Sequence, residues 1–221
     1  SDYFQQSVRY SLDVKLDDTD HFLRGNESVV YINHSPDTLW KLYFHLWPNA
    51  YRDENTVLAK TYFNDQNMRF LSAGEKGRGY IDSLDFSSEG NSLEWRLLTD
   101  TPEVSMIFLR NPLLPGDSVT ISTPFRLKYP SAGISRLGHT GQAYYSTQWY
   151  PKPAVYDRGG WKYIEYVDKG EYYSEFGSYD VTITLPKNYV VGATGKLLDG
   201  EEEIAWLDAL AKKTQATDSF N

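Results

Sequence analysis

The residues with the clearest potential for chemistry lie between positions 144 and 157. Gln148 stands next to Trp149 and Tyr150, and two prolines, Pro151 and Pro153, follow closely. An amide both donates and accepts hydrogen bonds, and the two rings combine apolar surface with a polar edge. Because proline lacks the amide proton that a strand ladder needs, we expect an edge strand to become a shaped loop here. Gln148, Trp149 and Tyr150 are therefore the candidate substrate-binding residues.

Metal ligation has little support in the sequence. No two histidines have the one-turn helical spacing of a zinc site. Asp17, Asp18 and Asp20 lack the glycine and the distant glutamate of a calcium loop. We therefore predict no metal site and no catalytic residue in this chain. The histidines in question are His21, His34, His45 and His139.

Carboxylates offer a weaker alternative. Acidic residues cluster between positions 165 and 175, and two carboxylates at the right separation could hydrolyse a glycosidic bond. They lie among residues typical of strands or loops, so the sequence predicts no mutual geometry for them. The residues are Glu165, Asp168, Glu171 and Glu175.

Composition excludes several classes of protein. The 221 residues carry 22 Lys and Arg against 30 Asp and Glu, and the net charge of −8 repels a phosphate backbone, so we expect no nucleic-acid partner. No stretch approaches the roughly 20 apolar residues of a transmembrane helix. The absence of cysteine leaves the compartment open. A periplasmic or secreted location is favoured if a signal peptide has been removed.

The elements that must position the candidate residues are mainly strands. Apolar and polar residues alternate over 8–16, 40–46, 119–127 and 179–185, which indicates strands with one buried face. Further strands are expected over 27–32, 80–86, 93–97 and 104–109, with turns at 89–91 and 115–116. Short strands with such turns predict a mainly β fold, a large antiparallel sandwich or curved sheet.

One helix is expected near the end of the sequence. Ile204, Leu207 and Leu210 form an apolar stripe, Glu201 begins an acidic first turn, and basic residues close the segment. We take 1–221 as a single domain that stops before its natural end, with 199–213 as a helical appendage or insertion.

Four segments resemble, in order and spacing, the opening β domain of aminopeptidase N-like zinc metallopeptidases. Residues 25–33 match a G-x-x-x-hydrophobic-x-x-x-N strand, and 39–46 match the L-x-F-x-L strand that follows it. Residues 146–151 resemble the T-Q-F-E-P/A loop of that family, and 180–195 resemble its next strand and hairpin. The individual motifs are short, and together they span most of residues 8–198.

The resemblance implies a saddle-like N-terminal β-sandwich domain that caps one side of a separate thermolysin-like zinc domain. The metal motif His-Glu-x-x-His and the substrate strand Gly-x-Met-Glu-Asn are both absent from this sequence. Zinc is thus implied for the missing domain and not for this chain, which should be inactive alone. The implied partners are that intramolecular catalytic domain and a peptide substrate, which the whole enzyme hydrolyses from its N-terminus.

The same resemblance places Tyr150 where the family has a Glu or Gln that binds the substrate's amino group. Either Gln148 takes over this role, or Tyr150 lends its hydroxyl, or the enzyme prefers substrates without a free N-terminus; we favour Gln148. The family loop turns sharply at this point, sometimes through a cis bond. We therefore expect a cis Tyr150–Pro151 bond, because the cis form costs little free energy before proline.

Two other classes of protein fit the composition. A carbohydrate-binding β-sandwich would stack sugars on exposed, coplanar rings of Trp149, Tyr150 and Trp161. A pure scaffold or adhesion domain would have no polar cluster at Gln148. Aromatic residues make up 15% of the chain, so each ring taken alone is expected to pack on a sheet face.

Overall fold

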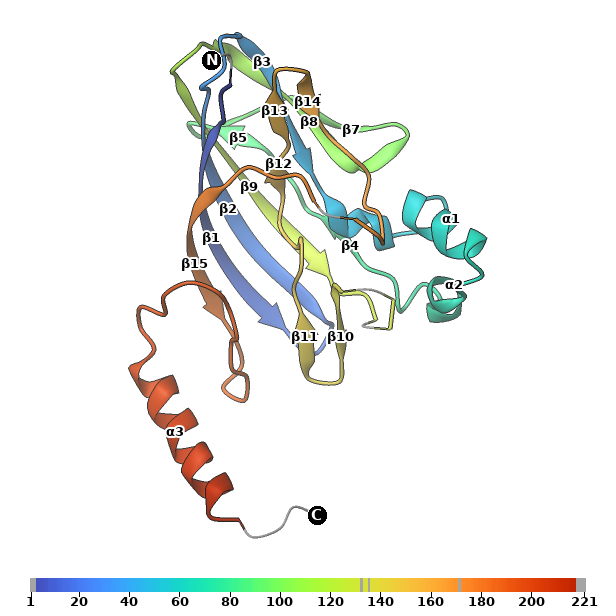
Figure 1. Cartoon of the computed structure of the whole chain (residues 1–221), viewed down its shortest axis with the longest axis vertical. Helices are drawn as coiled ribbons and strands as arrows, with labels where there is room; N and C mark the ends of the chain where they lie inside the picture. Colours follow the sequence, from blue (N-terminus) through green and yellow to red (C-terminus); the bar gives the residue numbers. More distant parts are fainter. Residues whose placement is uncertain (1–2, 132, 135, 171, 218–221) are drawn as a thin grey trace. The chain divides into compact units, whose positions relative to one another are not determined.

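The computed structural model describes residues 3–131, 133–134, 136–170 and 172–217. They form two compact units, 1–184 and 185–221. Most of the regular structure of the first unit is β-strand, and this unit contains the candidate loop (Figure 1). The mainly β fold predicted from the alternating pattern is confirmed.

The larger sheet of the first unit has seven strands in the order β15-β1-β2-β9-β5-β6, with β4 paired to β9. Its neighbours are antiparallel except β1 and β15, which run parallel. Three of the expected strands therefore lie side by side at its centre (Figure 1). The strands are β1 (Ser7–Asp17), β2 (Phe22–Ile32), β4 (Tyr80–Asp82), β5 (Ser87–Ser88), β6 (Asn91–Ser92), β9 (Ser118–Lys128) and β15 (Gly177–Thr184).

A second sheet has the antiparallel order β12-β3-β8-β7. Two small hairpins flank β12 in the sequence. The bounds are β3 (Leu39–His45), β7 (Trp95–Leu98), β8 (Thr101–Leu113) and β12 (Lys152–Pro153) for the sheet, with β10 (Gly138–Thr140), β11 (Ala143–Tyr145), β13 (Val155–Asp157) and β14 (Gly160–Lys162) for the hairpins. The candidate loop thus enters this sheet through β12.

The core contains side chains from both sheets. Tyr10, Leu12 and Val14 alternate with exposed residues along β1, and Phe44 of β3 is equally buried. The strand β15 departs from the expectation, because its whole length is exposed. The alternating pattern predicted the position of this strand correctly, but it wrongly predicted a buried face. The strand is exposed because β15 is the edge strand of the larger sheet.

Three short helical segments were not anticipated. They are the 3-10 helix η1 (Trp47–Tyr51), α1 (Val57–Asn64) and α2 (Arg69–Ala73). Residues 47–49 were expected to form a simple turn, but Pro48 lies near the start of η1, where its missing amide proton has no cost. The Thr56 side chain caps α1 by accepting a hydrogen bond from Ala59 N at 3.2 Å.

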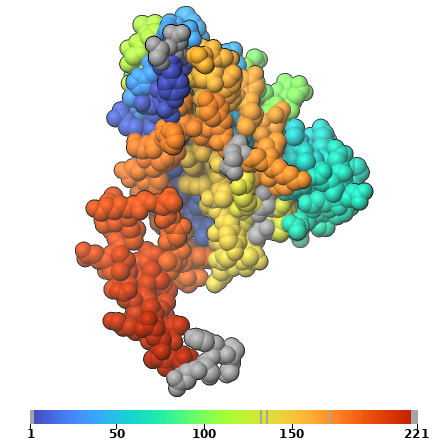
Figure 2. All heavy atoms as spheres, in the orientation of Figure 1, coloured from blue at the N-terminus to red at the C-terminus, as the bar shows by residue number. Residues whose placement is uncertain are grey.

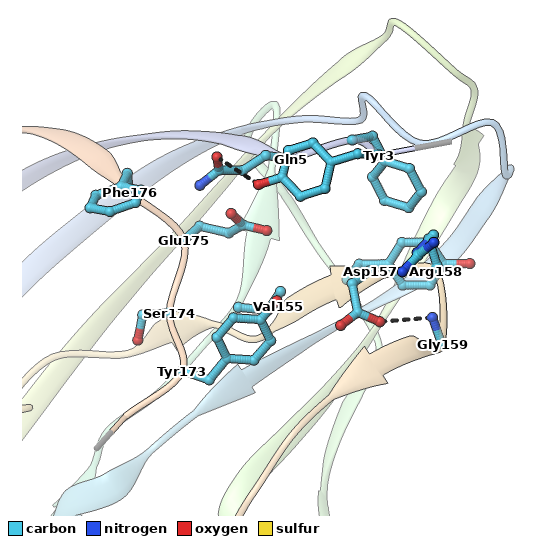
Figure 3. A pocket seen from close by; sticks show the side chains of 12 residues that line it. Tyr3, Gln5, Val155, Asp157, Arg158, Gly159, Tyr173, Ser174, Glu175 and Phe176 are labelled. Atoms are coloured by element: carbon cyan, nitrogen blue, oxygen red, sulfur yellow. Dashed lines mark hydrogen bonds between the residues drawn. The ribbon is translucent and has the colours of Figure 1, made fainter. Parts of the chain in front are cut away.

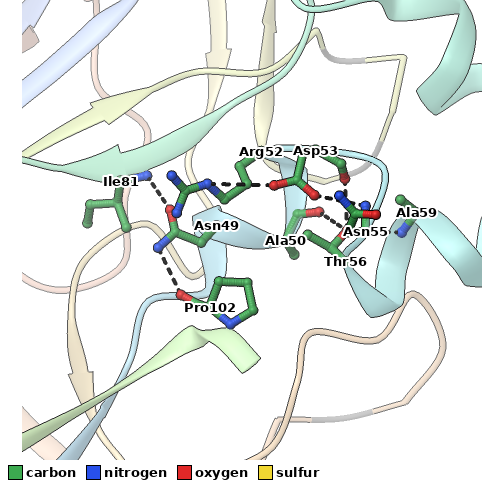
Figure 4. Close-up of polar contacts among 9 residues, drawn as sticks. All are labelled: Asn49, Ala50, Arg52, Asp53, Asn55, Thr56, Ala59, Ile81 and Pro102. Carbon is green, nitrogen blue, oxygen red and sulfur yellow. Dashed lines mark hydrogen bonds and ion pairs between the residues drawn. The ribbon is translucent and has the colours of Figure 1, made fainter. Parts of the chain in front are cut away.

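Asn49 connects η1 to both neighbouring strands (Figure 4). Its Nδ2 donates to Pro102 O at 3.0 Å, and its Oδ1 accepts from Ile81 N at 3.0 Å. The side chain is buried, so these bonds satisfy groups that water cannot reach. Asn49 therefore has a structural role.

The second unit consists of an irregular segment and the helix α3 (Glu201–Gln215). The predicted helix is confirmed within two residues at each end. Its first turn is acidic and its last turn holds Lys212 and Lys213, as the helix dipole favours. The apolar stripe is exposed, with Ile204 at 51% and Leu207 at 40%. Among the described residues, no helix is long and apolar enough to cross a membrane.

Gly25 of β2 makes room for the ring that supports the candidate loop. A Cβ atom at this position would lie 2.8 Å from Phe125 Cζ and 2.6 Å from Val14 Cγ1, closer than real Cβ contacts. The ring of Phe125 in turn lies 6.1 Å from the ring of Trp149, centroid to centroid. The glycine of the family-like motif is therefore explained by close packing.

We expect Gly25→Ala to lower the free energy of unfolding by about 1–3 kcal/mol, because the added methyl group must displace a core ring. Gly133→Ala is the matched control, since the nearest atom to its Cβ would be Ser131 Oγ at 4.0 Å. Urea denaturation followed by tryptophan fluorescence measures both changes. Equal midpoints for Gly25→Ala and the unsubstituted protein would contradict this packing.

Candidate functional site

The loop between β11 and β12 makes its sharp turn at Gln148. The φ angle of Gln148 is 52°, in the left-handed region that residues other than glycine rarely adopt. The predicted cis Tyr150–Pro151 bond is wrong, because this bond is trans. The left-handed residue of the loop is Gln148, three positions before the proline, and Pro151 leads directly into β12.

Gln148 is fixed by a buried lysine. Lys152 Nζ donates a hydrogen bond to Gln148 Oε1 at 2.8 Å. Only 9% of Lys152 is exposed, and its Nζ lies 5.5 Å and 5.1 Å from the ring centroids of Trp47 and Tyr150. Aromatic faces stabilise a desolvated ammonium group. The lysine therefore anchors the Gln148 side chain from beneath the loop.

Glu27 of β2 is the acidic counterpart of Lys152. It is 2% exposed, and neither carboxylate oxygen has a hydrogen-bond partner among the described residues. Burial raises the pKa of Glu27, and the charge of Lys152 opposes that rise. Burial likewise lowers the pKa of Lys152 to about 8, against the effect of Glu27. The two groups thus interact through space inside the first unit.

Tyr150 is tied to the edge of the larger sheet. Its hydroxyl donates to the hydroxyl of Tyr179 at 3.1 Å, and its ring meets the ring of Tyr10 edge-on at 5.5 Å. Burial is the first cause that raises the pKa of Tyr150, followed by the hydrogen bond to Tyr179. The phenol is therefore neutral at physiological pH and already engaged.

The aromatic candidates do not form a flat platform. Trp149 and Tyr150 are both partly buried, and their rings meet at 73° with centroids 5.0 Å apart. Trp161 packs against Tyr43 and Tyr156 at 5.5 Å and 5.0 Å. A sugar platform needs coplanar exposed rings, so this arrangement does not support the carbohydrate-binding alternative.

His45 and Trp47 hold the segment that follows β14. His45 Nε2 accepts a hydrogen bond from Ile164 N at 3.1 Å, and Trp47 Nε1 donates to Ile164 O at 3.3 Å. Burial, followed by the charge of Lys152, lowers the pKa of His45 to about 3. This histidine is therefore a neutral structural group.

The structure brings two of the scattered histidines together. The rings of His21 and His139 stack with centroids 3.6 Å apart, and His21 Nδ1 hydrogen-bonds to Tyr144 Oη at 2.7 Å. No group of three or more His, Cys, Asp or Glu residues that could hold a metal ion occurs in the described part of the chain. Stacked rings point their nitrogen lone pairs in parallel, which does not favour a shared ligand.

The acidic residues considered for glycoside hydrolysis have different partners. Asp168 accepts a hydrogen bond from Tyr62 Oη at 2.7 Å, whereas Glu175 lines a cavity together with Gln5. Glu171 lies outside the described residues. These contacts give no catalytic arrangement of paired carboxylates.

Lys152 and Glu27 belong to the site, but they were not predicted from the sequence. Glu27 falls at an inward position of β2, between Gly25 and Val29, so a charge on the buried face was a readable signal. Lys152 stands between two prolines, where no periodic pattern indicates burial.

Among known proteins, matches were found to solved structures alone. No family model matches the sequence, and no curated protein matches it. The M1 zinc metallopeptidase from Deinococcus radiodurans is similar with 12% identity, over 57% of this chain and 20% of that chain, with a TM-score of 0.32. A mutant M1 zinc metallopeptidase from the same organism, bound to a Tyr-Ser-Ala substrate, is similar with 12% identity over 89% and 37% of the two chains, with a TM-score of 0.43. This chain spans less than two fifths of the length of these structures.

We expect Lys152→Met to lower the free energy of unfolding by about 3 kcal/mol, because it leaves the Glu27 carboxyl buried without a cation. Adding Glu27→Gln should recover about 1–2 kcal/mol, since the second change removes the uncompensated acid. Urea denaturation at neutral pH gives the free energy of unfolding of the unsubstituted protein, of Lys152→Met, of Glu27→Gln and of the double variant. If the effects of Lys152→Met and Glu27→Gln on the free energy of unfolding simply added in the double variant, this would contradict an interaction between the two groups. Lys162→Met, which breaks an exposed pair with Asp157, is the control and should cost under about 1 kcal/mol.

The lowered pKa of Lys152 also predicts a pH dependence. Between pH 8 and the ordinary lysine range the unfolded chain holds this proton and the folded chain does not, so stability rises with pH. Relative to Lys152→Met, the unsubstituted protein should gain up to about 1.4 kcal/mol per pH unit between pH 8 and 10. Lys169→Met, at a lysine whose side chain is 84% exposed, should leave that slope unchanged. Parallel stability curves for Lys152→Met and the unsubstituted protein would refute the shift.

Proposed function

We propose that this chain is the N-terminal β domain of a larger zinc-dependent metallopeptidase of the aminopeptidase type, in which it shapes the entrance for the substrate's N-terminus. The sequence motifs at 25–33, 39–46, 146–151 and 180–195 support the proposal. The chain has no His-Glu-x-x-His motif, so zinc and the hydrolytic step belong to a separate catalytic domain. The isolated chain is accordingly inactive.

The observation that carries the proposal is the conformation of Gln148. Its left-handed backbone costs of order 1 kcal/mol or more, and such strain is characteristic of binding sites. Its side chain is held by Lys152 and remains partly exposed. A fixed polar group at the surface loses little conformational entropy when it binds a ligand.

The chemistry of the loop favours Gln148 over Tyr150 as the group that binds the amine. An amide oxygen has two lone pairs, and Lys152 uses one of them, so the other can accept from a substrate ammonium group. The Tyr150 hydroxyl already donates to Tyr179. Trp149 adds an apolar wall beside the amide.

The domain assignment is tested on the protein encoded by the complete reading frame. We expect stoichiometric zinc and stepwise release of N-terminal residues from unblocked peptides. A full-length protein that binds no zinc, or that releases no N-terminal residue, would contradict the proposed function.

In that enzyme, Gln148→Ala should lower kcat/KM for unblocked peptides by about 10- to 100-fold, the value of one hydrogen bond to a charged group. Tyr150→Phe should change it by less than about threefold, and a larger loss would assign the amine to the phenol instead. Tyr145→Phe is the matched control, because this exposed tyrosine belongs to β11. Full activity of Gln148→Ala would remove this residue from the site.

A further inference from the structure

A second candidate site lies in the first unit and uses none of the residues of the Gln148 loop. A cavity of about 410 Å³ is formed by the N-terminal segment, the β13–β14 hairpin and residues 173–176 (Figure 3). This volume is within the usual range for pockets that bind small molecules or side chains. The residues that matter for its chemistry are Phe4, Tyr156, Asp157, Tyr173, Glu175 and Phe176.

Glu175 is the least exposed acid of the cavity and has neutral partners. It is 9% exposed, and it interacts with the Gln5 side chain and the Gln6 backbone. None of the ion pairs in the described part of the chain includes it. Burial raises the pKa of Glu175, and the nearby Asp157 raises it further. A buried acid without a cation is stabilised by any cation that reaches it.

Asp157 makes a smaller contribution to the negative potential. Its Oδ1 accepts from Gly159 N at 2.7 Å and lies 3.4 Å from Lys162 Nζ. Its charge is therefore partly compensated, and the exposed Arg158 stands at the rim of the cavity. Glu175 remains the acid whose charge is not balanced by the protein.

Aromatic rings supply the rest of the wall. Phe4 stacks on Tyr156 with centroids 6.3 Å apart, while Tyr173 and Phe176 are 52% and 85% exposed. The faces of such rings attract cations and also cover the alkyl stem of a long basic side chain. Large exposed rings around a buried acid are suited to a cation that carries apolar groups.

The lining of the cavity suits an organic cation better than a metal ion. The cavity offers two carboxylates, and no group of three metal-binding side chains occurs among the described residues. A metal ion would also gain nothing from the alkyl-covering rings. Both the shape and the charge of the cavity thus favour an organic cation over a metal ion.

A neighbouring cavity indicates an elongated ligand. It has a similar volume of about 410 Å³ and shares Gln5 and Phe176 with the first. It extends along the beginnings of β1 and β15, past Val8 and Gly177. A peptide could place one side chain in the first cavity and its neighbouring residues in the second.

We propose that the cavity around Glu175 binds the basic side chain of a peptide, with its ammonium or guanidinium group beside Glu175 and its alkyl stem between the rings. This site is independent of the proposed peptidase function, because it requires only the first unit of this chain.

Binding is tested by NMR titration of the ¹⁵N-labelled chain with Nα-acetyl-lysine amide and Nα-acetyl-arginine amide. Their neutral counterparts, Nα-acetyl-norleucine amide and Nα-acetyl-citrulline amide, are the controls. We expect saturable shifts of Tyr173, Glu175 and Phe176 with a basic ligand, and at least tenfold weaker binding of its neutral counterpart. The two basic ligands distinguish ammonium from guanidinium. Equal binding of neutral and basic ligands, or no saturable shift with either basic one, would overturn the proposal.

Two substitutions test whether the ligand binds in the cavity around Glu175. Glu175→Gln, which keeps the size of the side chain and one acceptor oxygen, should weaken binding at least tenfold. Phe176→Ala removes an 85% exposed ring, so we expect it to leave the fold intact and to weaken binding severalfold. Glu165→Gln is the control, because Glu165 does not line the cavity. Unchanged affinity in both Glu175→Gln and Phe176→Ala would exclude this cavity.

Discussion

The buried ammonium group of Lys152 is the interaction on which the candidate loop depends. Lys152 is 9% exposed, so its ammonium group has lost hydration that the protein must replace. The replacement comes from three directions: the Gln148 amide above, the faces of Trp47 and Tyr150 at the sides, and the Glu27 acid in the opposite sheet. One buried charge thereby fixes both the loop and the spacing of the sheets around it.

The sheets provide this environment through their register. The pairing of Lys152 with His45 places β12 at the edge of the smaller sheet, and the pairing of Glu27 with Leu12 and Thr123 puts the acid at the centre of the larger one. In a strand the side chains alternate between faces, so a shift of one residue would expose Glu27. The site therefore depends on long strands whose registers are fixed by apolar neighbours.

The sequence predicted the strands well and the site only in part. Alternation located β1, β3, β9 and β15, because each of these strands repeats its pattern several times. The strands β2 and β8 were expected over only part of their lengths, 27–32 and 104–109. The helices at 47–73 are short and their apolar positions too few to form a period, so they were missed. Gln148, Trp149 and Tyr150 were selected by residue type. The burial of Lys152 beside Trp47 and Glu27, in contrast, depends on contacts across more than a hundred residues, which local patterns do not encode. The same limit explains the mistaken cis bond, since a left-handed φ at Gln148 leaves no trace in the sequence.

The parallel pairing of β15 with β1 also determines the order in which the first unit can assemble. Val8 lies beside Gly177, so the beginning and the end of this unit meet in the sheet, and closing so long a segment is entropically costly. During synthesis the outer edge of β1 therefore has no partner strand until nearly the whole unit has left the ribosome. Tyr150 finds its partner Tyr179 on that same last strand. The contact between the loop and the sheet edge can thus form only once β15 has joined β1, which makes the Tyr150–Tyr179 hydrogen bond a sign that the larger sheet is complete.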